Sequence, residues 1–144
     1  MTSATTTELD VLGALLAFDF IGFAQKSAAL DPTDPRYGQA VGTAFGIAAR
    51  RRFPRGASPR EISGYVAEVL GSLDAGGEDF DPAFLEGLVA AGLDEGAAPD
   101  GGHPDPETTI QARLVLTLRL VRELGLDAGQ QRELLAETAG RLAA

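Results

Sequence analysis

The sequence predicts an all-α protein, a single compact bundle of about six helices. Strong helix-start signals recur along the chain, and apolar residues follow each of them at helical spacing. Alternation of apolar and polar residues never lasts for the length of a strand, and β-branched residues are sparse. With 144 residues, 44% of them hydrophobic, the chain is long enough to bury one core.

The first three helices are predicted from their start signals. An apolar run from Leu9 to Leu30 predicts the first helix. The pair Asp34-Pro35, an N-cap followed by proline at the first helical position, predicts a second helix as far as about Phe53. The clearest start in the chain is Ser58-Pro59-Arg60-Glu61, which has the spacing of a capping box. The third helix is expected to end at Gly76-Gly77.

Three further helices are expected in the second half of the chain. They begin at Asp81-Pro82, at Asp105-Pro106 and at Asp127, and the last continues to the C-terminus. The glycine- and proline-rich residues 94–104 predict a mobile loop, and residues 1–7 predict a flexible N-terminus. We therefore expect one helical domain over residues 8–144.

Two of the expected helices, the first and the fifth, are apolar on more than one face. Such helices lie in the middle of a bundle or place one face against another subunit. The simplest arrangement is a bundle with helices one and five at its centre.

Composition excludes several classes of protein. The chain has no cysteine, so disulfides, thiolate catalysis and cysteine-zinc sites are excluded. The net charge of −9 disfavours a general nucleic-acid binder. Residues 1–7 lack the positive start of a signal peptide and no apolar stretch is long enough for a membrane span, so we expect a cytoplasmic protein without membrane contact. Eleven of the twelve basic residues are arginine, which together with abundant Ala, Gly and Pro indicates a bacterial source.

Basic and acidic residues are segregated along the chain. Residues 50–60 contain five arginines and no acid, whereas residues 61–107 contain twelve acids and no base. One hypothesis is a phosphate contact within a motif similar to a helix-turn-helix. The alternative, which we favour, is that these arginines stabilise the end of a helix and pair with the acids of residues 61–107 in the same molecule. The arginines are Arg50, Arg51, Arg52, Arg55 and Arg60.

Small residues recur at every fourth position of the second expected helix. Gly38, Gly42 and Gly46 therefore share one face, which lets another backbone approach closely. We expect this face to pack against the first helix. A second subunit is the alternative, so a homodimer stays open.

Asp19 has largely apolar neighbours on the surface of the first expected helix, among them Leu15 and Phe23. A buried carboxylate must be paired, hydrogen-bonded or protonated. The sequence therefore predicts a buried acid that pairs with Arg113 or Arg119 of the fifth helix. A functional acid in a pocket is the alternative.

Signatures of catalysis, metal binding or a cofactor are weak. His103 lies near Asp100, Asp105 and Glu107, but their spacing matches no metal-binding motif. No phosphate-binding loop and no Ser/His/Asp arrangement is visible. We expect no metal and no cofactor, and we expect that the protein is not an enzyme.

These observations favour a non-catalytic regulatory or adaptor protein that binds another protein. The first alternative is a small nucleic-acid-binding regulator that uses the five arginines. The second alternative is a small-molecule binder with a pocket between helices one and five, covered by the loop over residues 94–104.

Overall fold

A computed structural model of the chain describes five stretches, residues 10–17, 19–28, 35–72, 81–93 and 106–143. A helical segment over residues 10–16 comes first. Six helices follow, namely α2 (Phe20–Ala28), α3 (Pro35–Arg52), α4 (Pro59–Ser72), α5 (Pro82–Leu93), α6 (Pro106–Leu124) and α7 (Ala128–Ala143). No strand occurs within these stretches, so the predicted all-α fold is confirmed. The expected flexible N-terminus and the loop over residues 94–104 lie outside them.

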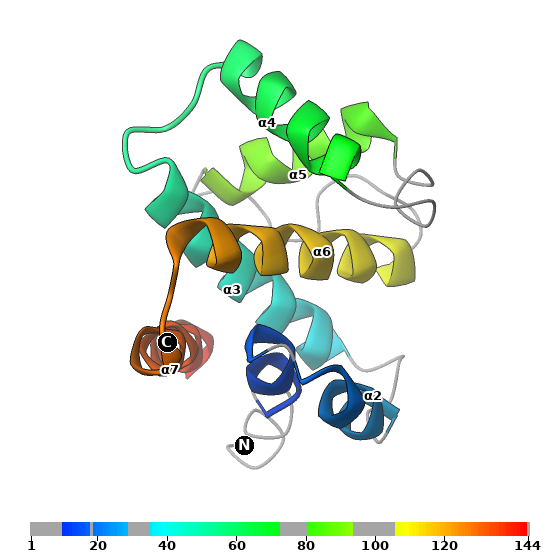
Figure 1. Cartoon of the computed structure of the whole chain (residues 1–144), viewed down its shortest axis with the longest axis vertical. Helices are drawn as coiled ribbons and strands as arrows, with labels where there is room; N and C mark the ends of the chain where they lie inside the picture. Colours follow the sequence, from blue (N-terminus) through cyan, green and yellow to red (C-terminus); the bar gives the residue numbers. More distant parts are fainter. Residues whose placement is uncertain (1–9, 18, 29–34, 73–80, 94–105, 144) are drawn as a thin grey trace.

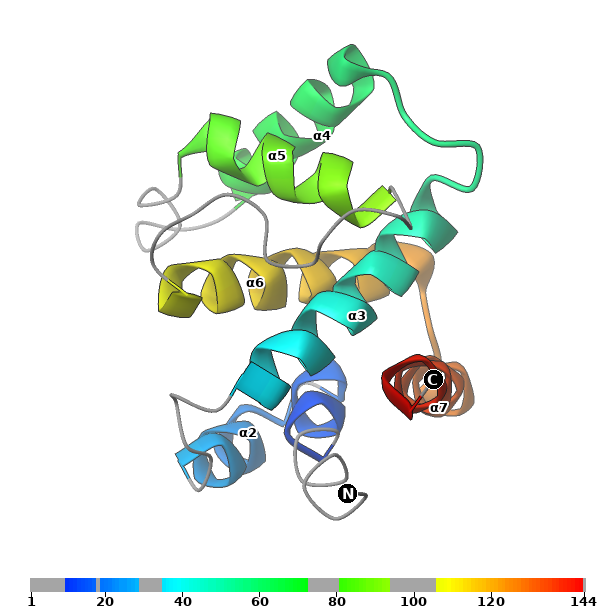
Figure 2. The ribbon, with the colours of Figure 1, turned by 180° about the vertical axis from the view of Figure 1, so that it is seen from behind.

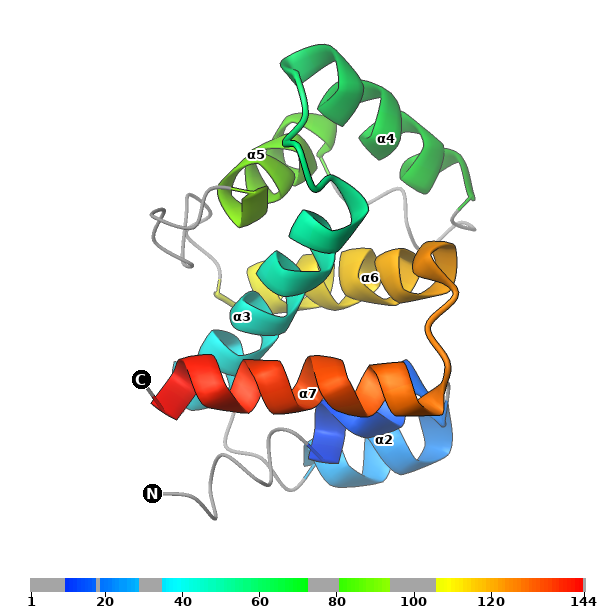
Figure 3. The same ribbon diagram turned by 90° about the vertical axis from the view of Figure 1, so that its left-hand side faces the viewer.

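The helices are arranged in three tiers (Figure 1). One end of the molecule holds α4 and α5, the middle holds α6 crossed by α3, and the other end holds α7, α2 and the segment over residues 10–16. Views from behind and from the side show that α3 runs obliquely through all three tiers (Figures 2 and 3). It packs against α5, α6 and α7.

The expected central place of helix five is found for α6, and α3, the second expected helix, lies at the centre beside it. All residues from Ala44 to Ala49 are buried, so α3 has no solvent-facing side there. The small side chains of α3 let several helices approach it closely.

The buried side chains form three groups around α3. The largest surrounds Phe45 and draws on α4, α5 and α6, with Val69, Leu88 and Leu116 among its members. Two smaller groups attach the helical segment over residues 10–16 and α7 to the remainder of α3. Each fully buried leucine or phenylalanine contributes about 1.5–3 kcal/mol relative to an exposed one, so these contacts dominate the stability of the fold.

The apolar run from Leu9 to Leu30 is not one helix, because it breaks at Asp19. The N–H groups of Gly22 and Phe23 donate to Oδ1 and the carbonyl oxygen of Asp19 (2.9 and 2.8 Å), so this residue is the N-cap of α2. Asp19 is exposed, which corrects the prediction of a buried acid. The break turns the chain away from the core, and Ile21 in α2 is 75% exposed.

Local capping signals fix the other helix ends. Ser58 and Glu61 form the predicted capping box, because the Glu61 N–H donates to Ser58 Oγ (3.2 Å) and the Ser58 N–H donates to Glu61 Oε1 (2.9 Å). Asp127 and Gln130 repeat this arrangement at the start of α7. Gly125, with φ of 62°, ends α6 in a Schellman motif.

No helix within the described stretches is both long and apolar enough to span a membrane.

Candidate functional site: an open cleft between α3 and α4

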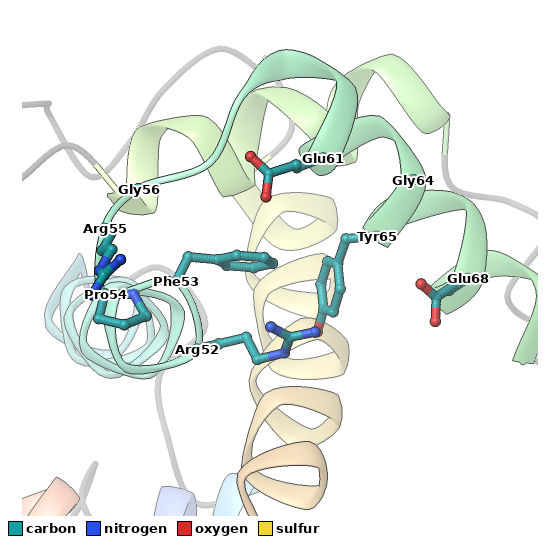
Figure 4. A pocket seen from close by; sticks show the side chains of 9 residues that line it. All are labelled: Arg52, Phe53, Pro54, Arg55, Gly56, Glu61, Gly64, Tyr65 and Glu68. Atoms are coloured by element: carbon teal, nitrogen blue, oxygen red, sulfur yellow. The ribbon is translucent and has the colours of Figure 1, made fainter.

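An open cleft of about 450 Å³ lies where α3 gives way to α4 (Figure 4). The turn over residues 53–56 separates the two helices, and the N–H of Gly56 donates to the carbonyl oxygen of Phe53 across it (2.9 Å). Gly56 has φ of 80°, a conformation that favours glycine. The turn therefore holds the end of α3 and the start of α4 at a fixed angle, and the cleft is the space between them.

Two aromatic rings form the floor of the cleft. Phe53 follows α3 and Tyr65 comes from α4, and their rings meet edge to face with centroids 5.4 Å apart. The guanidinium carbon of Arg52 lies 4.7 Å from the centre of the Phe53 ring and 5.8 Å from that of Tyr65. Both distances are typical of cation–π contacts, so the rings and the arginine hold one another in place.

A carboxylate on α6 lies behind this floor and binds two arginines. Glu123 accepts a hydrogen bond from Nε of Arg52 (3.0 Å) and one from Nε of Arg119 (2.7 Å). Partial burial raises the pKa of Glu123, but the hydrogen bonds and positive charges of the two arginines outweigh it and lower the pKa overall. Glu123 therefore stays ionised at neutral pH and fixes the Arg52 side chain from behind.

The hydroxyl group of Tyr65 is buried and makes no hydrogen bond of good geometry in the described part of the chain. The residue is 5% exposed, and its ring lines the cleft beside Arg52 (Figure 4). Burial raises the pKa of Tyr65, and the charge of Glu123 and the interaction of the hydroxyl with that carboxylate raise it further. The hydroxyl is thus protonated at neutral pH and directed toward Glu123 as its acceptor.

The walls of the cleft carry charged side chains of opposite sign. Arg55 stands on the turn, and Glu61 and Glu68 stand two helical turns apart on α4. The hydrogen bonds from the Ser58 backbone and hydroxyl lower the pKa of Glu61, which is therefore ionised. Gly64 lies between the two glutamates, and a Cβ built on it would meet no heavy atom within 4 Å. This glycine keeps the cleft open along α4.

Three of the five predicted arginines bind other groups of the same molecule. Arg50 Nη1 donates to the carbonyl oxygen of Gly92 at the end of α5 (2.9 Å), and Arg51 Nη2 pairs with Glu137 of α7 (2.7 Å). Arg52 pairs with Glu123 of α6 as described above. These three arginines thus lie in the last turn of α3 and bind groups of α5, α7 and α6.

The sequence did not identify the acids that these arginines use. Arg51 and Arg52 pair with acids of α7 and α6, and not with the acidic residues 61–107 that the sequence suggested. Arg55 and Arg60 are exposed. Of the five, these two keep the whole guanidinium free of partners among the described residues.

The predicted glycine face packs inside the molecule at two of its three positions. A Cβ on Gly38 would lie 3.5 Å from Ile110 of α6, and one on Gly46 would lie 3.5 Å from the carbonyl oxygen of Gly92 in α5. Gly42 is half-buried. The close neighbours at Gly38 and Gly46 are α6 and α5, and not the first helix as expected.

The remaining candidate residues lie outside the described stretches or have no described side chain. His103, Asp100 and Asp105 belong to the first class, and Glu107 to the second. Within the described stretches, no three His, Cys, Asp or Glu side chains gather as a metal site would require. No family model, curated protein or solved structure matches this chain.

Sequence reasoning located the arginines but missed the rest of the cleft. Phe53, Tyr65 and Glu123 were not singled out, because they belong to separate elements and no spacing rule connects them. The one available signal was a lone aromatic residue beside three arginines at the expected end of a helix, which is the pattern of Phe53.

Proposed function

We propose that the protein is a non-catalytic regulatory or adaptor protein that binds a segment of a partner protein in the cleft between α3 and α4. The observation that carries this proposal is an open cleft whose lining combines two aromatic rings with charged side chains of both signs. Arg52, whose side chain is 39% exposed, lies beside Tyr65 in this lining (Figure 4). An acceptor on the partner would reach its guanidinium group from the open side of the cleft.

The shape of the cleft favours a chain segment over a small molecule. A small-molecule site typically encloses 70–90% or more of its ligand's surface. This cleft is open along α4, and it is not the pocket between helices one and five that the second alternative requires. A segment of a partner protein can lie along such a surface while the rest of the partner covers its outer side.

The charges of the cleft favour a protein over a nucleic acid. Of the five arginines, Arg55 and Arg60 are the two that bind no other group within the part of the chain that the structure describes. Glu61 and Glu68 stand on the same surface and would repel a row of phosphates. The net charge of −9 also repels a nucleic acid, and it does so at longer range.

The test is an affinity capture from the host lysate, with and without nuclease, using three forms of the protein. Gly64→Gln fills the open space in the cleft, whereas Gly87→Gln places the same side chain in the middle of α5, outside the cleft. Both glycines are exposed and neither Cβ would meet another atom within 4 Å, so both variants should fold at least as stably as the original chain.

The proposal expects a protein partner that survives nuclease and is lost with Gly64→Gln but retained with Gly87→Gln. A partner that binds all three forms equally would show that the cleft is not the binding surface. Recovery of nucleic acid, with loss of protein partners after nuclease, would favour the arginine-based alternative instead.

A further inference from the structure

The two walls of the cleft carry opposite charges that do not pair with each other. Arg52 and Arg55 belong to the α3 side, and Glu61 and Glu68 belong to α4. No ion pair joins the two sides among these described residues. The cleft is therefore a polar slot with a positive and a negative wall and an aromatic floor.

Two of these four charges have hydrogen-bond partners outside the opposite wall, and the other two are exposed. Arg52 gives its Nε to Glu123 on α6, and Glu61 accepts from the backbone of Ser58 at the helix start. Arg55 and Glu68 are exposed to solvent. The cleft thus retains unused donors on one side and unused acceptors on the other.

We infer that the cleft binds a dipolar peptide segment of a partner protein, one that carries an acidic and a basic side chain near each other. The acidic side chain would lie against Arg52 and Arg55, and the basic one against Glu61 and Glu68. This inference rests on the proposed function and specifies its ligand. It is argued from charge complementarity across the two walls.

The acidic subsite has the donors that a carboxylate requires. Among the described residues, the Arg52 guanidinium donates only through Nε, so its two Nη groups have no acceptor there. Two N–H donors of this kind match a carboxylate. Arg55, which is exposed on the same wall, adds a second positive charge.

The basic subsite lies above Gly64. Glu61 and Glu68 are three residues before and four residues after this glycine, so all three share one face of α4. The Cα positions of the two glutamates are about 10 Å apart along the helix axis, at 1.5 Å per residue. A lysine or arginine side chain of the partner fits between them, because no side chain of α4 occupies that position.

A ligand with charges of only one sign would leave the charges of one wall without an opposite charge. A polyanion would gain from Arg55 but would meet both glutamates, and a polycation would gain from the glutamates but would meet both arginines. The lining contains two charges of each sign in its nine residues, so only a ligand with both signs matches both walls.

The test measures the affinity of four short blocked peptides by NMR titration of the ¹⁵N-labelled full chain. The probes are acetyl-Glu-Ala-Ala-Lys-amide and the three versions in which Gln replaces Glu, Lys or both. The amides of Gly56 and Gly64 report directly on the cleft. We expect the dipolar probe to bind most tightly, with a loss of about two- to fivefold for each charge removed, as for exposed ion pairs.

Variants of the protein assign each charge of the peptide to its wall. Arg55→Gln should reduce the preference for Glu over Gln in the peptide, since Arg52 remains, and Glu68→Gln should reduce the preference for Lys over Gln, since Glu61 remains. Arg132→Gln and Glu133→Gln make the same charge changes on the exposed face of α7 and should preserve both preferences. Raised salt should weaken the preferences in the original chain.

Equal binding of all four peptides, no binding of any, or the tightest binding by a singly charged peptide would overturn the inference. Tighter binding of a single-stranded oligonucleotide, dependent on Arg55, would overturn it in favour of nucleic acid. The proposed function is tested separately, by whether Gly64→Gln loses the partner protein in the affinity capture. If no peptide binds while Gly64→Gln still loses that partner, the dipolar ligand is wrong and the cleft remains the binding surface.

Discussion

The contact between the end of α5 and the middle of α3 gives a sharp test of the packing. A Cβ added at Gly92 would lie 2.8 Å from Cε2 of Phe45 and 3.3 Å from its Cδ2. The Phe45 side chain is 1% exposed and is surrounded by the largest group of core residues. Its ring cannot move without displacing those neighbours, so Gly92→Ala must strain the core.

The expected magnitude follows from two opposing effects. Adding a methyl group to a well-packed core typically costs about 1–3 kcal/mol. Replacing a helical glycine by alanine gains at most about 1 kcal/mol, and less near a helix end. We therefore expect Gly92→Ala to lower the free energy of unfolding by about 1–2 kcal/mol. For a chain of this length, that corresponds to a fall in Tm on the order of 5 °C.

The matched control is Gly87→Ala in the same helix. Its Cβ would meet no heavy atom within 4 Å, so only the helix-propensity gain applies and the free energy of unfolding should rise by about 0.5–1 kcal/mol. Urea denaturation of both variants and the original chain, followed by far-UV circular dichroism, measures the difference. Gly92→Ala at least as stable as Gly87→Ala would refute the close packing of α5 on Phe45.

Three further predictions concern caps and ion pairs. Asp127→Ala should lower the free energy of unfolding by about 1 kcal/mol, because the Gln130 N–H loses its acceptor, and chemical denaturation checks this. Glu123→Gln should be destabilising at neutral pH by about 1 kcal/mol. The pKa of Glu123 is lowered in the folded state, so the stability that this carboxylate provides is present above its ordinary pKa. That stability is lost as the pH falls through the lowered pKa. The denaturation curves of the variant and the original chain should therefore converge in acid. A double-mutant cycle on Arg51 and Glu137 should give a coupling energy of about 0.2–1 kcal/mol, because their side chains are 34% and 39% exposed. This coupling energy should decrease as salt is added. A coupling energy of zero would mean that the ion pair does not hold α7 in place.

The sequence predicted the helix boundaries well because capping depends on nearby residues. The Ser58 and Asp127 signals specify hydrogen bonds that span three residues, and both are present in the structure. Proline after an acid or serine adds a second local signal at the start of α4 and α5. A few consecutive residues are therefore enough to predict where such a helix begins.

The sequence failed where two local interpretations competed. Asp19 lies within an apolar run, which suggested a buried acid in a long helix, but the same residue type is also a preferred N-cap. The structure shows the cap, and the run divides there. Nothing within the run distinguished the two, because the choice depends on where the following chain packs.

The candidate site was only partly predictable for a different reason. The arginines at the end of α3 marked the region, but their acceptors Gly92, Glu123 and Glu137 belong to three other helices. The Phe53–Tyr65 pair likewise depends on the angle at which α4 leaves the turn. Such contacts are set by tertiary packing, which a single sequence without its fold does not specify.

The three arginines that end α3 also bear on the order in which the protein assembles. The acceptors of Arg50, Arg51 and Arg52 come 42, 86 and 71 residues later in the chain. Synthesis proceeds from the N-terminus at about 5–20 residues per second, so these acceptors follow α3 by several seconds. A nascent chain that already contains α3 and α4 therefore lacks the groups that anchor Arg51 and Arg52. Arg52, and with it one wall of the cleft, is therefore anchored only after α6 has been made.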